Sequence, residues 1–302
     1  MTFISDSAVN RLRDALDRPD AGDRYIVADL VGQGGMGSVY RATDTVLGRD
    51  VALKVLALGS EGPELARRLA TEARVLASLE HPGIVAVHDA GVLADGRPYY
   101  VMRLIRGRRF GDHVRSTGRG AVLRLFLRVC EAVAFAHARG VIHRDLTPSN
   151  IMVGEFGEVL VLDWGLATAA SAMGSTVIAA GTPGFMAPEQ LAGGAVPIDE
   201  RSDIFGLGAI LGVVLGGAGG ELPRPLAAII AKATNPDPAG RYGSAEALAD
   251  DVQRWLDAEP VSAYREPPWE RAARLYQRHQ ALVLLLATYM VVRLLLFWWR
   301  HI

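Results

Sequence analysis

The amino-acid sequence predicts an α+β fold followed by one transmembrane helix. Short apolar, strand-like segments occur early in the chain, at 51–54 and 98–104. An amphipathic helix is expected at 63–80, where leucines recur at helical spacing, and further helices at 202–215 and 223–234.

Composition narrows the class of protein. Half of the 302 residues are hydrophobic, which is enough for a sizeable core, and the formal net charge of −1 argues against nucleic acid as the main partner. The lone Cys130 excludes an intrachain disulfide and suits a reducing compartment. No apolar run follows a basic start in residues 1–24, so we expect a short N-terminal arm without a signal peptide.

A glycine-rich segment begins at Gly32 and continues through Gly34 and Gly37 to Val39. Glycines at this spacing let a loop cover the phosphate groups of a nucleotide. In a dinucleotide-binding turn the third glycine would open a helix, but the residues at 38–42 are β-prone, so a hairpin fits better. A plain glycine-rich surface turn is the alternative.

A possible ion pair follows the glycine segment. Lys54 ends a short apolar strand, and Glu72 lies near the buried side of the helix expected at 63–80. A glutamate there is costly unless it is paired, and Lys54 would provide the partner. The alternative is a solvated Glu72 on the helix surface.

The chemistry is concentrated in the segment from His143 to Asn150 and in the Asp163-Trp164-Gly165 triplet. Phosphoryl transfer needs an aspartate that orients a hydroxyl nucleophile and oxygen ligands for magnesium. Asp145 would supply the first, and Asn150 with Asp163 the second. Read in isolation, Asp145 and Asn150 would be turn formers.

Six patterns occur in one order: the glycine segment, Lys54, Glu72, the His143-Arg144-Asp145 loop, the Asp163 triplet and Ala187-Pro188-Glu189. In this order the chain resembles the bacterial, eukaryotic-like (Hanks-type) serine/threonine protein kinases over roughly 25–257. The resemblance implies a bilobal fold, with a small β-rich N-lobe and a larger helical C-lobe. It also implies ATP and Mg²⁺ as cofactors and proteins as substrates.

The resemblance assigns roles to individual residues. Asp145 orients the substrate hydroxyl, Asn150 and Asp163 hold magnesium, and Lys54, held by Glu72, positions the phosphates. The segment at 98–104 would be the hinge that binds adenine through its backbone. Met102 would lie at the back of the adenine pocket; the alternative is an ordinary methionine of an edge strand. The nucleotide-binding set is Val31, Gly32, Gly34, Gly37, Val39, Ala52, Lys54 and Met102.

Three features depart from the family pattern. Thr147, which belongs to the expected catalytic residues, occupies a position where these kinases usually carry a lysine. Losing such an electrostatic donor costs about 3 to 4 kcal/mol. Activity would therefore be slow unless another cation substitutes. Trp164 replaces the commoner phenylalanine and keeps an aromatic ring there. Only 216–222 separates two helices where the family inserts another, which would reduce substrate docking.

By the same resemblance, the small, polar residues at 168–176 belong to an activation loop. A phosphate there would pair with Arg144 and order the loop; the candidate acceptors are Ser171, Ser175 and Thr176. Thr182 would contact the catalytic aspartate, which is typical of serine/threonine specificity. Asp203 would brace the catalytic loop, and Arg241 would pair with Glu189.

The C-terminus becomes basic and then apolar. The nineteen residues at 281–299 reach roughly 28 Å as a helix, close to the thickness of a bilayer core. Apolar residues favour insertion by about 5 kcal/mol, against about 3 for Arg293. The arginines before this run predict a single-pass cell-membrane protein with the kinase domain in the cytoplasm. A soluble core or oligomerisation helix is the alternative.

The sequence thus predicts five parts: arm 1–24, kinase domain 25–257, basic juxtamembrane linker 258–280, transmembrane helix 281–299 in the lipid bilayer and tail 300–302. We expect an ATP-dependent serine/threonine protein kinase that phosphorylates protein substrates, with a possible homodimer for autophosphorylation. A membrane-tethered pseudokinase with little turnover is the rival, motivated by Thr147. A small-molecule phosphotransferase is disfavoured by Ala187-Pro188-Glu189.

Overall fold

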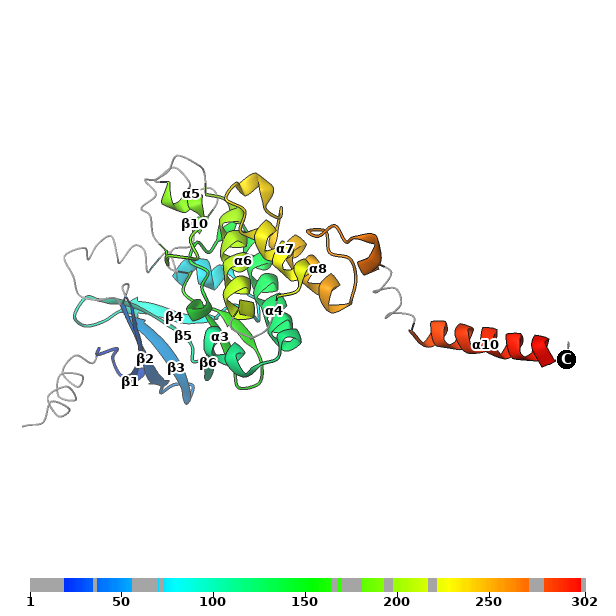
Figure 1. Ribbon diagram of the computed structural model, residues 1–302. Helices are drawn as coiled ribbons and strands as arrows, with labels where there is room; N and C mark the ends of the chain where they lie inside the picture. Colours follow the sequence, from blue (N-terminus) through cyan, green and yellow to red (C-terminus); the bar gives the residue numbers. More distant parts are fainter. Residues whose placement is uncertain are drawn as a thin grey trace, which may run out of the picture.

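A computed structural model gives the architecture (Figure 1). The structure describes residues 19–34, 37–55, 70, 73–164, 168–169, 181–192, 198–216, 222–271 and 280–299. These residues form a small sheet-containing N-terminal lobe and a larger helical C-terminal lobe, as the resemblance implied.

The N-terminal lobe is a five-stranded antiparallel sheet with the order β1-β2-β3-β5-β4. Its strands are β1 (Tyr25–Gly34), β2 (Gly37–Asp44), β3 (Arg49–Val55), β4 (Val87–Val92) and β5 (Pro98–Arg103). Branched and aromatic side chains pack on it, among them Val51, Leu53 and Val101. The strands expected at 51–54 and 98–104 are confirmed as parts of β3 and β5.

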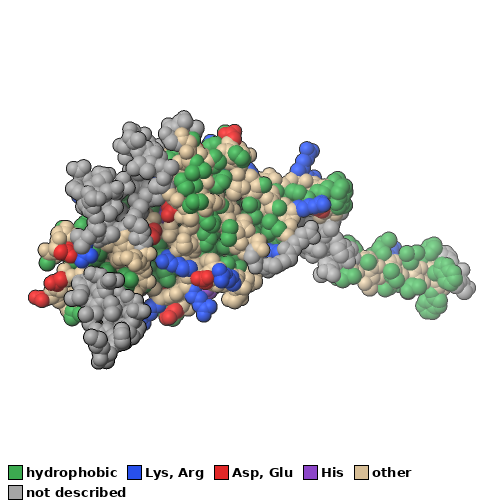
Figure 2. All heavy atoms as spheres, turned by 60° about the vertical axis from the view of Figure 1, so that its left-hand side comes forward, with side chains coloured by type: hydrophobic (Ala, Val, Ile, Leu, Met, Phe, Trp, Pro, Cys, Tyr) green, Lys and Arg blue, Asp and Glu red, His purple; other side chains and the backbone are tan. Residues whose placement is uncertain are grey.

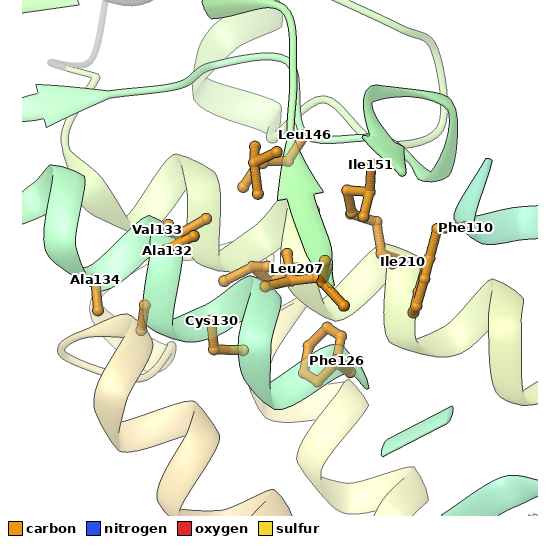
Figure 3. Packing of buried hydrophobic residues seen from close by; sticks show 14 of the residues in the cluster. Phe110, Phe126, Cys130, Ala132, Val133, Ala134, Leu146, Ile151, Leu207 and Ile210 are labelled. Atoms are coloured by element: carbon orange, nitrogen blue, oxygen red, sulfur yellow. The ribbon is translucent and has the colours of Figure 1, made fainter. Parts of the chain in front are cut away.

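Four helices build most of the C-terminal lobe. They are α4 (Arg119–His137), α6 (Glu200–Gly216), α7 (Arg224–Ala233) and α8 (Ala245–Leu256). The helices expected at 202–215 and 223–234 are confirmed as α6 and α7. Figure 3 shows Phe126 of α4 beside Leu207 of α6 in the buried core. Gly208 lets α6 approach α7 closely, because an added Cβ would lie 2.6 Å from the Cβ of Ala233.

Short elements join these helices to the site. The strands β6 (Gly107–Arg109), β8 (Ile151–Gly154) and β9 (Val159–Val161) form a second sheet, and β7 (Val141–Ile142) pairs with β10 (Thr168–Ala169). The short helices are α3 (Phe110–His113), η1 (Val114–Ser116), η2 (Pro148–Asn150), α5 (Pro188–Leu191) and η5 (Pro238–Gly240).

The packed structure continues beyond residue 257, where the sequence placed the end of the domain. Val261 is buried in the core cluster, and Ala263 and Tyr264 pack against that cluster. The start of the expected linker is therefore part of the folded lobe. Of the helix expected at 63–80, residues 70 and 73–78 are helical, and most of the remainder, including Glu72, lies outside the described residues.

The last helix, α10 (Gln280–Trp299), lies apart from the two lobes in Figure 1. Large apolar side chains are exposed along it from Leu284 to Trp299, and Figure 2 shows them on its visible face. Within the part of the chain that the structure describes, no helix combines the length and apolar character needed to cross a membrane. The transmembrane helix expected at 281–299 is therefore not supported.

Candidate active site

The β8–β9 hairpin brings the two expected magnesium ligands together. Asn150 immediately precedes β8, Asp163 follows β9, and Ile151 pairs with Val161 across the hairpin. The Leu162 amide donates a 2.8 Å hydrogen bond to the Asn150 carbonyl, so the two ligand positions leave the hairpin at the same end.

Lys54 extends from β3 of the other lobe to this point. Its Nζ lies 2.8 Å from Oδ1 of Asp163, and the lysine is only 4% exposed. Burial would raise the pKa of Asp163, but the charge and hydrogen bond of Lys54 outweigh it and hold that pKa below its ordinary value. The ionised carboxylate of Asp163 can bind a metal ion, and the buried ammonium of Lys54 beside it can bind phosphate oxygens.

Two residues of the site have unusual backbone geometry. Arg144 and Asp163 have φ angles of 70° and 55°, in the left-handed region that residues other than glycine rarely adopt. Such strain persists only where surrounding contacts enforce it, and it is concentrated at functional sites. Here the two strained residues stand on either side of Asp145 and Asn150 in the sequence.

Asp145 is held by contacts on both carboxylate oxygens. Oδ1 accepts bonds from the Thr182 amide at 3.0 Å and from the Thr182 hydroxyl at 2.9 Å, while Oδ2 accepts from Nδ2 of Asn150 at 3.1 Å. Nδ2 of Asn150 also donates a hydrogen bond to the backbone carbonyl of Asp145. The side-chain oxygen of Asn150, Oδ1, is therefore the atom left to bind a cation. The expected contact of Thr182 with Asp145 is confirmed.

These residues fit magnesium. In the described part of the chain there is no group of three or more His, Cys, Asp or Glu able to hold a metal ion. Magnesium is commonly held by one or two carboxylates with substrate phosphates and water. Asp163 and the Asn150 amide oxygen would hold the ion, and Lys54 would meet the phosphates.

Thr147 has a structural role at the start of η2. It is 1% exposed, and its hydroxyl lies 2.7 Å from that of Ser149. The hydroxyl also accepts a hydrogen bond from the backbone amide of Asn150 at 3.2 Å. The threonine therefore caps the turn that presents Asn150, in the way that Ser and Thr cap helices. Its hydroxyl brings no charge to the transferred phosphoryl group.

Asp203 of α6 braces the catalytic loop from beneath. Its carboxylate accepts bonds from the backbone amides of His143 and Arg144, both at 2.8 Å, and lies 2.8 Å from Nε2 of His137. Burial would raise the pKa of Asp203, but these contacts hold it below its ordinary value. The ring of His143 packs in a tilted arrangement against the buried Trp164, with ring centroids 4.6 Å apart.

The expected nucleotide-binding residues lie on neighbouring strands. Val31 and Gly32 are on β1, Gly37 and Val39 on β2, and Gly34 ends β1. Gly37 has a φ of 145°, which suits glycine. Two pairs cross the sheet: Val39 with Lys54, and Ala52 with Met102. The sheet thus lines up the glycine hairpin, the lysine and the expected hinge.

Several expected residues cannot be placed, and others were missed. Glu72, Gly165 and the candidate phosphorylation sites Ser171, Ser175 and Thr176 lie outside the described residues. Sequence reasoning missed Gln190, whose amide donates to the Arg144 carbonyl at 2.7 Å, and Arg109, which donates to the Ser149 carbonyl. Neither stands in a recognisable motif, so no local pattern indicated them.

Comparison with known proteins agrees with this geometry. A family model described as "Protein kinase domain" matches residues 25–219, and the chain belongs to that family. The resemblance to bacterial kinases of the Hanks type is thereby confirmed.

Two similar curated proteins are described as serine/threonine-protein kinases. The chain is 33% identical to the serine/threonine-protein kinase PknD of Chlamydia pneumoniae, over 79% of this chain and 32% of that protein. It is 33% identical to PknB of Mycobacterium leprae, over 81% of this chain and 45% of that protein. The chain thus spans less than half the length of these curated relatives.

A crystal structure of the Mycobacterium tuberculosis PknI kinase domain aligns with a TM-score of 0.59. The identity is 29%, and the alignment covers 77% of this chain and 96% of that domain. The match therefore includes nearly all of a kinase domain and supports the bilobal kinase fold.

Proposed function

We propose that this chain is a serine/threonine protein kinase that transfers the γ-phosphoryl group of ATP to protein hydroxyls. The observation that carries the proposal is that two sets of contacts meet at one end of the β8–β9 hairpin. Lys54 pairs with Asp163, and Asn150 and Thr182 donate hydrogen bonds to Asp145. Relatives described as serine/threonine-protein kinases support the same activity.

In the reaction, the oxygen of the substrate hydroxyl forms a bond to the γ-phosphorus. The bond from that phosphorus to the bridging oxygen breaks, its electron pair leaves with ADP, and the hydroxyl proton passes to the carboxylate of Asp145. Magnesium, when bound, neutralises charge on the phosphates. Lys54 positions the phosphates, and Asn150 orients Asp145 through its amide nitrogen.

The test is phosphate transfer from labelled ATP to the chain itself and to a generic protein. Asp145→Asn removes the proton acceptor and is expected to lower transfer by at least about 10²-fold. Asp112→Asn, at an exposed position on α3, is the matched control and should retain activity. Equal transfer by the native chain and Asp145→Asn would contradict the proposal.

Specificity for serine and threonine is part of the proposal. Its support is the pair of bonds from Thr182 to the catalytic carboxylate. Peptides that differ only in carrying Ser, Thr or Tyr at the acceptor position would measure it. Transfer to the tyrosine peptide at the rate of the serine peptide would exclude this specificity.

A pseudokinase that binds nucleotide or partner proteins is the second candidate. It is favoured by the uncharged Thr147 and by the short segment, 217–223, that separates α6 from α7. The two functions separate in one experiment, because a pseudokinase would bind the magnesium complex of ATP while native protein and Asp145→Asn gave the same background transfer.

We also infer that a phosphate on Ser171, Ser175 or Thr176 pairs with Arg144. The Nε atom of Arg144 is buried without a hydrogen-bond partner, and burial lowers the pKa of its guanidinium. A phosphate oxygen would satisfy that donor. Mass spectrometry after incubation with ATP should find phosphate in this segment, and an active enzyme with the segment unmodified would contradict the inference.

Association with the cell membrane, with the kinase domain in the cytoplasm, stays a prediction. Its support is the exposed apolar surface of α10, which no described residue covers. The protein should sediment with membranes through carbonate extraction, and deletion of 281–302 should release it. Autophosphorylation within a homodimer is likewise a prediction, and transfer rates that rise with the square of protein concentration would support it.

A further inference from the structure

The catalytic loop of this chain lacks a positive charge at the position where its relatives usually have a lysine. Thr147 stands there, buried and bonded to Ser149 and to the Asn150 amide. Charge builds up on the phosphoryl oxygens during transfer, and cationic groups are the usual means of stabilising it. A kinase with Thr147 therefore needs a cation from another element.

Arg109 is placed to supply it. The residue ends β6, where it pairs with Met152 of β8, and its guanidinium donates a hydrogen bond to the Ser149 carbonyl. Ser149 lies two residues after Thr147 and immediately before Asn150. The guanidinium thus rests on the catalytic loop beside the residue that would bind magnesium.

The Arg109 guanidinium can bind a second group besides the Ser149 carbonyl. A guanidinium has five N–H donors in a planar fork. One bond to Ser149 leaves donors for phosphate oxygens, and the exposed side chain can turn toward them.

Two other cations of the described residues near the loop already have assignments. Lys54 pairs with Asp163, and Arg144 is the proposed partner of a phosphate on the segment 171–176. We propose that Arg109 takes the place of the missing lysine and contacts the phosphoryl group as it moves from ATP to the substrate hydroxyl. This inference rests on the proposed kinase function and names a further catalytic residue for it.

Nucleotide affinity tests the proposal without turnover. The probes are the magnesium complexes of ADP and of the non-hydrolysable ATP analogue with an imido bridge, measured by calorimetry. Arg109→Ala should weaken binding of the analogue by about tenfold, the loss of one charged contact, and change ADP binding by less than about twofold. Arg115→Ala, which removes an exposed arginine paired with Asp112, should change neither.

Kinetics supply a second readout through a double-mutant cycle with Thr147→Lys. In the native background Arg109→Ala should lower kcat by about 10²-fold. In the Thr147→Lys background, where the lysine restores the charge, the same change should cost less than about fivefold. Arg109→Lys should recover part of the loss, because it keeps the charge.

An equal loss from Arg109→Ala in both backgrounds would overturn the proposal, and so would an unchanged ratio of analogue to ADP affinity. If the native chain transfers no phosphate, the proposed kinase activity fails, and the affinity ratio still decides whether Arg109 contacts the terminal phosphate. Circular dichroism of each variant separates these effects from misfolding.

Discussion

Arg241 and Glu189 form a two-pronged ion pair inside the C-terminal lobe. The distances are 2.6 Å from Nη1 to Oε1 and 2.8 Å from Nη2 to Oε2, and both residues are buried. Arg241 also donates to the carbonyls of Arg201 and Asn235. The pair ties the end of the lobe to the segment that contains Thr182, and Thr182 contacts Asp145.

Arg241→Ala should destabilise the domain. It leaves Glu189 as an unpaired buried charge, which costs about 3 to 5 kcal/mol. Arg115→Ala removes an exposed arginine and should cost less than about 1 kcal/mol. Urea denaturation measures both. If Arg241→Ala lowers the free energy of unfolding no more than Arg115→Ala does, the stabilising role of the Arg241–Glu189 pair is contradicted.

The same pair predicts an acid sensitivity. Burial would raise the pKa of Glu189, but the bond and charge of Arg241 lower it below the ordinary value of 4.5. A lowered folded-state pKa gives stability that is present above 4.5 and is lost as pH falls through the folded value. Arg241→Ala should therefore reduce the dependence of stability on pH in this acid range.

His137 predicts a dependence of opposite sign. Burial would lower its pKa, but the hydrogen bond and charge of Asp203 raise it above 6.5, with smaller contributions from Glu200 and Glu246. Stability from protonated His137 is then complete below pH 6.5 and is lost as pH rises through the folded value. His137→Gln should remove this decrease, measured by urea denaturation between pH 6 and 9. Parallel curves for the two proteins would contradict the assignment.

The fold and the main contacts of the site could be predicted because their signals are local. Strand-forming runs gave β3 and β5, and helical spacing gave α6 and α7. The Asp145 loop is short, so its motif implies its geometry. The pairing of Glu189 with Arg241 came from resemblance, since no periodicity joins residues 52 positions apart.

Some contacts between distant elements were not predicted. Lys54 was expected to pair with Glu72, which lies outside the described residues, and its direct bond to Asp163, 109 positions away, was not expected. Arg109 meets Ser149 only because β6 pairs with β8. The segment after residue 257 reads as a linker by its prolines, yet it packs on α8 because a buried carboxylate binds its backbone. Such contacts depend on tertiary register, which composition does not encode.

Lys54→Met should remove the ion pair that joins β3 of the N-terminal lobe to Asp163. Without the ammonium, the pKa of Asp163 should rise, since Lys54 is the main group that lowers it. Carbon-13 NMR of labelled aspartate measures that pKa directly. Affinity for the magnesium complex of the ATP analogue should fall by about tenfold or more. An unchanged pKa of Asp163 would show that the two groups do not interact in solution.

Asp251 should determine whether the C-terminal segment stays attached to the lobe. The carboxylate is fully buried and accepts bonds from the Tyr242 hydroxyl at 2.9 Å, from the Ser262 amide and hydroxyl, both at 2.7 Å, and from the Ala263 amide at 3.0 Å. Asp251→Asn replaces one acceptor oxygen with a donor that would face other donors.

Asp251→Asn should lower the free energy of unfolding by about 3 kcal/mol. The backbone amides at 261–264 should exchange hydrogen faster than in the native chain. Asp257→Asn is the matched control, because Asp257 is exposed and accepts one side-chain bond from Gln253. Hydrogen exchange with mass spectrometry reports the segment separately from the core. Protection at 261–264 that is the same in all three proteins would mean that another contact holds the segment in place.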